Sequence, residues 1–146
     1  MQFKDQIGNA ITLHKPPERI VSLVPSQTEL LIDLGLKKSL VGITKFCVHP
    51  KELRKEIKVV GGTKSLHYDK VKALSPDLII CNKEENTKEM VVELQKIAPV
   101  WVSDIFSIDD SFEMIRGLGE ICSRKKQATE LISKIISEKE SFKSFV

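Results

Sequence analysis

The sequence predicts an α/β fold in which a parallel sheet of about four to five strands is flanked by helices. Short apolar runs rich in β-branched residues, such as residues 19–24, are typical of strands buried on both faces of a parallel sheet. Segments with helical spacing and capping residues alternate with these runs along the chain. Strands that alternate with helices are joined by right-handed crossovers, which makes the strands parallel.

Each element is assigned from its own local pattern. Residues 2–13 alternate between apolar and polar around Gly8, which indicates an N-terminal β-hairpin. Ser26 is expected to cap the first helix, with Glu29 closing a capping box and Gly35 ending the helix. The strands of the sheet are predicted at residues 19–24, 40–44, 59–60, 77–81 and 100–102. The helices are predicted at residues 27–34, 50–55, 68–74, 87–97, 108–122 and 123–145.

The last third of the sequence predicts two helices with no further strand. We therefore divide the chain into an N-terminal α/β lobe, residues 1–107, and a helical segment, residues 108–146. A final helix over residues 123–145 would be roughly 34 Å long at 1.5 Å per residue, which indicates a long backbone helix. Apolar residues recur along it at helical spacing, so we expect self-association or a neighbouring molecule to cover the stripe. The stripe includes Ala128, Leu131, Ile132, Ile135 and Phe142.

Composition excludes several classes of protein. Hydrophobic residues make up 41% and charged residues 29% of the 146 residues, as in ordinary globular domains. The formal charge is only +3 and the basic residues are spread along the chain, so we expect no nucleic-acid partner. No apolar run approaches the roughly 18 residues of a membrane span. The first residues lack the apolar centre of a signal peptide, so either the protein is cytoplasmic or its export segment lies outside this sequence.

The three cysteines do not indicate a disulfide framework or a structural zinc site, because their number is odd and no CxxC spacing occurs. Cys81 and Cys122 are interpreted as buried small hydrophobic residues. Cys47 and His49 lie two positions apart on one loop and are candidates for a metal ion or for axial ligation of a chelate. The same pair leaves a Cys-dependent enzyme as an alternative, but no third orienting group is identifiable and no dinucleotide, P-loop or nucleophile-elbow motif occurs. We therefore expect a binding protein, not an enzyme.

Three stretches of the sequence resemble the helical-backbone class of periplasmic substrate-binding proteins, which serve ABC importers of iron–siderophores, haem and cobalamin. Arg19-Ile-Val-Ser-Leu-Val-Pro-Ser-Gln-Thr-Glu-Leu30 resembles their first strand and helix, and Val60-Gly-Gly-Thr63 resembles their glycine turn. Leu74-Ser-Pro-Asp-Leu-Ile-Ile80 resembles the entry into a later strand. The three motifs occur in the family's order and spacing, and the resemblance covers about residues 5–146.

The resemblance implies a function, partners and a compartment. In this family an N-terminal α/β lobe is joined by one long helix to a second lobe, and the ligand, here expected to be a metal chelate, binds between them. No intrinsic cofactor is implied. An acidic residue on each lobe docks onto an ABC permease, and the matching position here is Asp69. The family is periplasmic or held at a membrane surface, and a cytoplasmic sensor of the same fold is the alternative.

Ligands of open parallel sheets lie beyond the carboxyl ends of the strands, so the loops there are expected to carry the site. Free N–H groups at the start of the first helix favour an anionic group, and Phe46 can stack on a planar ligand. Relatives that bind cobalamin carry aromatic residues at the positions of Thr63 and Asn82, so this sequence favours a polar, hydrogen-bonding ligand. Trp101 is expected in the core. The candidate ligand-binding residues are Pro25, Ser26, Phe46, Cys47, His49, Thr63, Lys64, Asn82, Lys83, Glu84 and Asp104.

Overall fold

The centre of the protein is a five-stranded parallel sheet with the strand order β5-β4-β3-β6-β7. The computed structural model describes residues 1–46, 53–62 and 64–145, and the side chains of the last helix as far as Glu138. The predicted parallel α/β fold is confirmed, with all five predicted strands present. The strands are β3 (Ile20–Ser22), β4 (Leu40–Ile43), β5 (Lys58–Val59), β6 (Leu78–Asn82) and β7 (Val100–Ser103).

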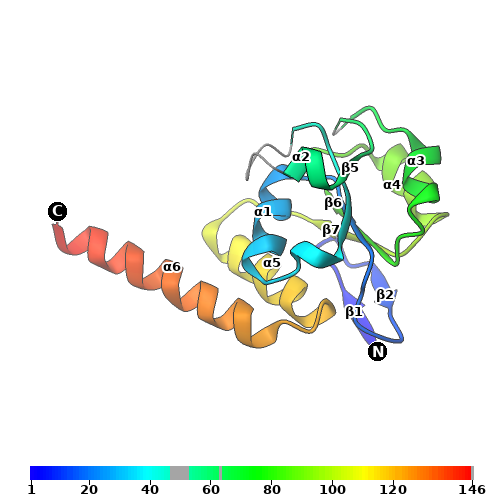
Figure 1. Cartoon of the computed structure of the whole chain (residues 1–146). Coiled ribbons are helices and arrows are strands. Elements are labelled where there is room, and N and C mark those ends of the chain that lie inside the picture. The colour runs from blue at the N-terminus through cyan, green and yellow to red at the C-terminus, as the bar shows by residue number, and fades with distance from the viewer. Residues whose placement is uncertain (47–52, 63, 146) are drawn as a thin grey trace.

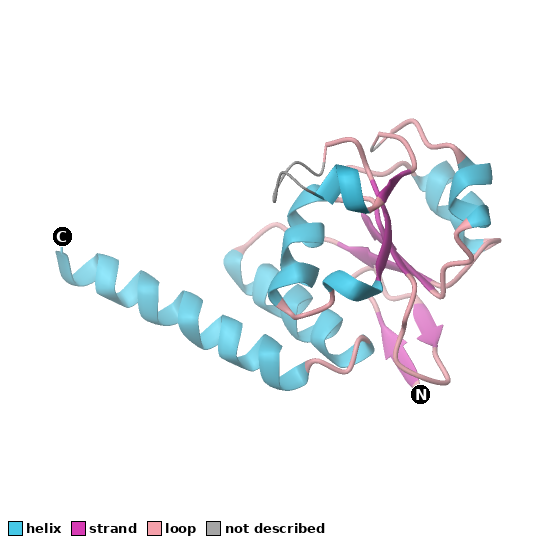
Figure 2. Ribbon diagram, viewed as in Figure 1, coloured by secondary structure: helices cyan, strands magenta, loops and turns pink. Residues whose placement is uncertain are grey.

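Helices cover both faces of the sheet (Figure 2). α1 and α5 lie against one face, and α3 and α4 lie against the other. Within the described ranges, no helix is both long enough and apolar enough to cross a membrane. The helices are α1 (Pro25–Asp33), α2 (Leu53–Glu56), α3 (Tyr68–Ala73), α4 (Lys88–Gln95), α5 (Ile108–Ile121) and α6 (Lys125–Phe145), with a short 3₁₀ helix at Lys37–Ser39.

Burial on both faces explains why the strands are continuous apolar runs. Successive side chains of a strand point to opposite faces of the sheet. In β6, Ile80 packs in the core on the side of α1 and α5, and Ile79 packs in the core on the side of α3 and α4. Trp101 of β7 is buried on the α5 side, as predicted. Every position of these strands is therefore constrained by packing.

The start of α1 differs from the prediction. The N-cap is Val24, which makes no side-chain capping bond, and Pro25 occupies the first turn. The fixed φ of proline suits the first helical position, so the helix begins at Pro25, two residues earlier than a Ser26 cap allows. The predicted capping box is therefore wrong, and Ser26 is an exposed residue within the first turn. Gly35, at φ +83°, follows the end of the helix as predicted.

The predicted N-terminal hairpin is confirmed and docks onto the edge of the main sheet. It consists of β1 (Gln2–Lys4) and β2 (Ala10–Thr12), which pair antiparallel. The main-chain N–H of Val102 in β7 donates to Asp5 Oδ2 at 3.1 Å, and the Gln6 N–H donates to the Val102 carbonyl at 3.1 Å. Asp5 Oδ1 accepts two further bonds from amides of its own turn. The turn thus replaces a neighbouring strand at this part of β7.

The long C-terminal helix is present and extends away from the rest of the chain (Figure 1). Its first half packs on α5, where Ile132 is 6% exposed within the main hydrophobic core. The expectation that Ile132 needs a neighbouring molecule to cover it is therefore wrong. Ile135 is partly buried against the same core, and the side chain of Phe142 lies outside the described residues. α5 also contributes to this core, so the proposed boundary at residues 107 and 108 marks the start of α5 within one shared core.

The turn after β5 depends on one glycine. Gly61 has φ +131°, a backbone conformation that side chains disfavour, and a Cβ at this position would clash with the Ser65 carbonyl oxygen. Gly61 also forms an isolated antiparallel bridge with Leu66, and its carbonyl accepts the Lys45 N–H at 2.9 Å. This glycine fixes the turn that carries Lys64 and joins it to the end of β4.

The packing of α6 on α5 can be tested with two isoleucines of one helix. Ile132→Ala should lower the free energy of unfolding by about 2–4 kcal/mol, because it removes buried methyl groups and leaves a cavity. Ile136→Ala is the matched control and should cost less than about 1 kcal/mol, since Ile136 is 40% exposed. Urea denaturation followed by circular dichroism measures both. Equal effects of the two substitutions would contradict the docking of α6.

The Gly61 turn can be tested with its neighbour as the control. Gly61→Ala should destabilise the protein by about 1–3 kcal/mol, because alanine at φ +131° is strained and its Cβ meets backbone. Gly62→Ala should change the stability by less than about 0.5 kcal/mol, since its Cβ meets only Lys45 and Phe46 side-chain atoms at 3.4 Å. Thermal unfolding of both variants gives the comparison. A tolerated Gly61→Ala would show that the turn has a different backbone conformation.

Candidate functional site

The carboxyl ends of the five strands meet at one edge of the sheet, which we call the carboxyl edge. The chain adds β4 and β5 on one side of β3, and then crosses to add β6 and β7 on the other side. As a result, α1 and α4 leave this edge over opposite faces of the sheet. A parallel sheet built in this way has a crevice beyond the strand ends at the point of reversal, here between β3 and β6.

A layer of buried polar side chains lies along the carboxyl edge. Among the described residues, eight polar or charged side chains are buried, and all but Asp5 lie at or just beyond the carboxyl ends of strands. Sequence analysis identified only one member of this layer, Asn82, as a candidate site residue. The layer consists of Ser22, Gln27, Thr28, Thr44, Asn82, Asn86 and Ser103.

Ser103 is the centre of the hydrogen bonds in this layer. Its hydroxyl accepts from the Gln27 side-chain amide and from Asn82 Nδ2, the latter at 2.9 Å, and donates to the Cys81 carbonyl at 3.3 Å. Gln27 belongs to α1, and Asn82 is the last residue of β6. These bonds tie the start of α1 to the ends of β6 and β7. Within the described structure, Gln27 Oε1 is buried without a hydrogen-bond partner.

Asn82 shapes the loop after β6. Its Oδ1 accepts from the N–H groups of Glu84 and Glu85 at 2.9 and 3.0 Å, and its own N–H donates to Asn86 Oδ1 at 2.9 Å. The Asn82 side chain is buried, whereas Lys83 and Glu84 are exposed on the loop. Asn82 therefore holds the loop that presents its two predicted neighbours to solvent.

Phe46 and two lysines lie on the β4–β5 side of the carboxyl edge. Phe46 is 52% exposed, and Lys45 Nζ lies 5.2 Å from the centre of its ring, within the range of a cation–π contact. Both side chains approach Gly62, so the loop after β4 packs against the glycine turn that carries the exposed Lys64. Sequence analysis did not select Lys45, although it directly follows a strand end. The predicted residues Cys47, His49 and Thr63 lie outside the described residues.

The structure brings Lys83 and Asp104 together on the other side of the edge. Lys83 Nζ lies 3.8 Å from Asp104 Oδ2, and the second oxygen of Asp104 is buried with no hydrogen-bond partner among the described residues. Pro25 and Ser26 lie between the two sides, at the start of α1, half-buried and exposed respectively. Asp69, the predicted docking residue, is exposed in the first turn of α3.

Phe106 is a candidate site residue that sequence analysis missed. It lies in the short loop between β7 and α5 and is 75% exposed. Its main-chain N–H donates to Asp110 Oδ2 at 2.9 Å. The sequence gives only a weak signal for it, because Phe106 lies three positions after the end of β7, beside the apolar Ile105, which packs against the core.

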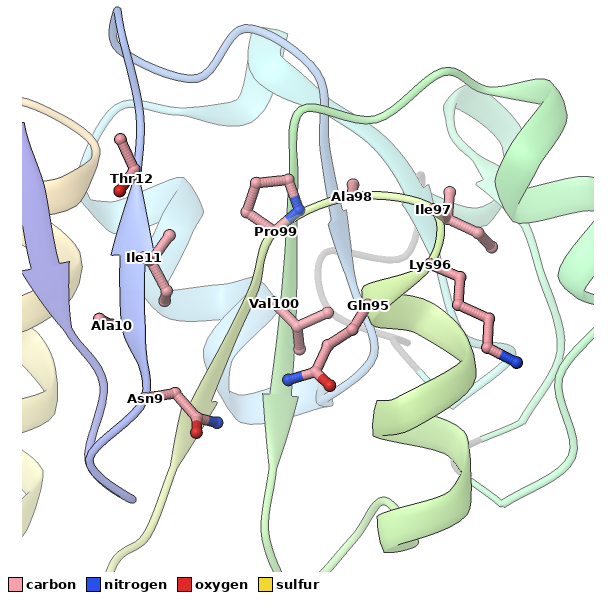
Figure 3. A pocket seen from close by; sticks show the side chains of 10 residues that line it. All are labelled: Asn9, Ala10, Ile11, Thr12, Gln95, Lys96, Ile97, Ala98, Pro99 and Val100. Atoms are coloured by element: carbon pink, nitrogen blue, oxygen red, sulfur yellow. The ribbon is translucent and has the colours of Figure 1, made fainter.

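Two other features do not contribute to the carboxyl edge. A cavity of about 370 Å³ lies between β2 and the chain that enters β7, at the amino end of that strand (Figure 3).

Burial raises the pKa of the Cys81 thiol and that of the Cys122 thiol to about 12, so both thiols are protonated at neutral pH. In the part of the chain that the structure describes, no three His, Cys, Asp or Glu side chains gather as metal ligands.

Several known proteins are similar to this chain over most of its length. The ABC transporter substrate-binding lipoprotein YvrC of Bacillus subtilis is 31% identical over 138 residues, which are 92% of this chain and 43% of the relative. The vitamin B12-binding protein of Pectobacterium carotovorum is 26% identical over 113 residues, which are 77% of this chain and 41% of that protein. The chain thus spans less than half the length of these two relatives.

The fold of this chain is also similar to that of solved structures. The petrobactin-binding protein YclQ of Bacillus subtilis superposes with a TM-score of 0.82 at 26% sequence identity, over 94% of this chain and 50% of that one. Residues 20–146 match the family described as periplasmic binding protein. This match includes the whole parallel sheet, the carboxyl edge and α6. The chain therefore belongs to the periplasmic binding protein family.

Proposed function

We propose that this chain forms the N-terminal ligand-binding lobe of a substrate-binding protein for an ABC importer, and that it holds a metal chelate between this lobe and a second one. The observation that carries the proposal is the carboxyl edge, where all five strand ends present loops above a hydrogen-bonded polar layer. Short loops on such a rigid base are where binding residues usually lie. α6 supports the two-lobe arrangement, because it extends beyond the lobe as a single long helix (Figure 1).

The side chains at the edge favour a ligand with a planar apolar face and anionic groups. Phe46 offers a ring for stacking. Lys45 and Lys64 are exposed, and no ion pair with an acidic residue is found for either within the described ranges. At the start of α1, the main-chain N–H of Ser26 can attract negative charge, whereas Pro25 has no N–H and that of Gln27 donates to the Val24 carbonyl at 3.1 Å. Ferric siderophores, haem and corrinoids combine these properties in different proportions.

The remaining predicted residues complete the proposed site. Lys83, Glu84 and Asp104 provide polar groups on the β6–β7 side of the carboxyl edge, and Asn82 holds the loop of Lys83 and Glu84. We propose that Cys47, His49 and Thr63 contribute from the loops after β4 and β5. Asp69 is proposed to dock onto the permease, since its side chain is exposed in the first turn of α3. The compartment proposed is the periplasm or the membrane surface.

Titration of the protein at its natural length tests the ligand class. Haemin, cyanocobalamin and ferric tris-catecholate serve as ligands, and visible absorbance reports binding, because Trp101 is too deeply buried to report directly. Lys64→Ala should weaken the binding of an anionic chelate by about 1 kcal/mol, which raises Kd about fivefold. The matched control is Lys96→Ala at the end of α4, which should leave Kd unchanged. Binding of none of the three ligands, at concentrations up to the millimolar range, would contradict the proposal.

Catalysis by the buried cysteines can be tested by thiol labelling. With pKa values raised to about 12, Cys81 and Cys122 should stay protonated at pH 8 and react with Ellman's reagent only on unfolding. A Cys47→Ser variant isolates them, and we expect labelling to be at least about a hundredfold slower in buffer than in 6 M guanidinium chloride. The wild type under the same conditions is the control. Rapid labelling of the folded variant would show that one of the two thiols is accessible and ionised.

A further inference from the structure

Phe106 is more exposed than any other large apolar side chain described at the carboxyl edge. It is 75% exposed, compared with 52% for Phe46. It belongs to residues 104–107, the loop that joins β7 to α5. Exposed aromatic side chains on short rigid loops are typical contact residues, because stacking on them orders few additional torsions. The position of Phe106 at the edge therefore needs an explanation beyond folding.

The loop of Phe106 is held at both ends by one residue of the N-terminal hairpin. Gln6 Oε1 accepts the main-chain N–H of Asp104 at 3.0 Å, at the start of the loop. Gln6 Nε2 donates to the carbonyl of Asp110 at 2.9 Å, in the first turn of α5. The Gln6 N–H also donates to the Val102 carbonyl in β7 at 3.1 Å. All three bonds connect segments about a hundred positions apart in the sequence.

Asp110 passes this restraint on to Phe106. Its carboxylate Oδ2 accepts the Phe106 N–H at 2.9 Å, while its carbonyl accepts from Gln6. Its own N–H donates to the Ser107 hydroxyl, which caps α5. The main chain of Phe106 is thus fixed on both sides, and its ring remains in solvent. Such a restraint keeps the ring available for contact. It also lowers the entropy cost of binding, because less of the loop has to be ordered.

We infer that Phe106 is a ligand-contacting residue of the cleft, and that Gln6 is the positioning residue that presents it. This inference rests on the proposed function, since it assigns Phe106 to the ligand of the same carboxyl edge. Phe46 and Phe106 follow β4 and β7, which lie on opposite sides of β3 in the sheet. A ligand held above the crevice would then meet an aromatic ring on each side. The ligand class is one with a planar or apolar face, such as a macrocycle or a catecholate ring.

A double-mutant cycle on ligand binding tests both roles. With whichever of haemin, cyanocobalamin or ferric tris-catecholate binds the wild type, Phe106→Ala should raise Kd about tenfold, and Gln6→Ala about threefold to fivefold. In the Phe106→Ala background, Gln6→Ala should raise Kd less than it does alone, because only its hydrogen bond to the main chain of Asp104 is then left to affect the site. Ile108→Ala and Ile7→Ala are the matched controls: each removes a partly exposed apolar side chain next to a tested residue, and neither should change Kd. Additive effects of Gln6→Ala and Phe106→Ala would overturn the positioning role, and an unchanged Kd for Phe106→Ala would overturn the contact.

Hydrogen exchange separates failure of this inference from failure of the proposed function. Gln6→Ala should speed exchange of the Asp104 amide about fivefold to tenfold, because the acceptor of that N–H is lost, while exchange in β3 and β6 stays as in the wild type. Ile7→Ala should leave the Asp104 amide unchanged. If the wild type binds none of the three ligands, the proposed function fails, and the contact assigned to Phe106 fails with it. Unchanged exchange in Gln6→Ala would overturn the restraint even if a ligand binds.

Discussion

The hydroxyl of Ser103 is the point on which the carboxyl edge depends. It is fully buried, and it joins α1, β6 and β7 through bonds from Gln27 and Asn82 and to Cys81. Pairing of buried polar groups stabilises the fold, since leaving one unpaired costs about 1–3 kcal/mol. The polar loops of the edge therefore cannot rest directly on the apolar core. A hydrogen-bonded layer between the two gives them a base with defined geometry.

This layer explains how the protein combines a rigid apolar core with polar loops at the carboxyl edge. Asn82 uses its side chain to close the loop that carries Lys83 and Glu84, so two exposed charges are placed by one buried amide. On the far side of the sheet, the backbone conformation of Gly61 sets the turn that carries Lys64. In each case one residue, through its hydrogen bonds or its backbone conformation, determines where an exposed candidate ligand residue lies. Specificity can then change at the exposed positions without disturbing the base.

Much of the fold could be predicted from the sequence, because burial on both faces of a parallel sheet leaves continuous apolar runs that are visible locally. The predicted start of α1 was wrong, because a cap at Ser26 would leave Pro25 outside the helix, whereas Pro25 is its first residue. The bond between Gln27 and Ser103 spans 76 positions, and no local pattern marks it. Phe106 was missed for the same reason, because its exposure depends on how the loop is held. Strand ends could be located from sequence, but the contacts between them could not.

The hairpin turn that binds β7 also covers part of an outer edge of the main sheet, where a strand of another molecule could otherwise pair. The outermost strands of a sheet expose N–H and C=O groups that can pair with strands of another molecule. Here the outer strands are β5, which has only two residues, and β7, whose Val102 is already bonded to Asp5 and Gln6. β5 is too short to pair stably with a strand of another molecule. In β7, the N–H and C=O groups of Val102 are already hydrogen-bonded to the hairpin turn. The outer strands of the main sheet therefore leave little free edge for a strand of another molecule to pair with.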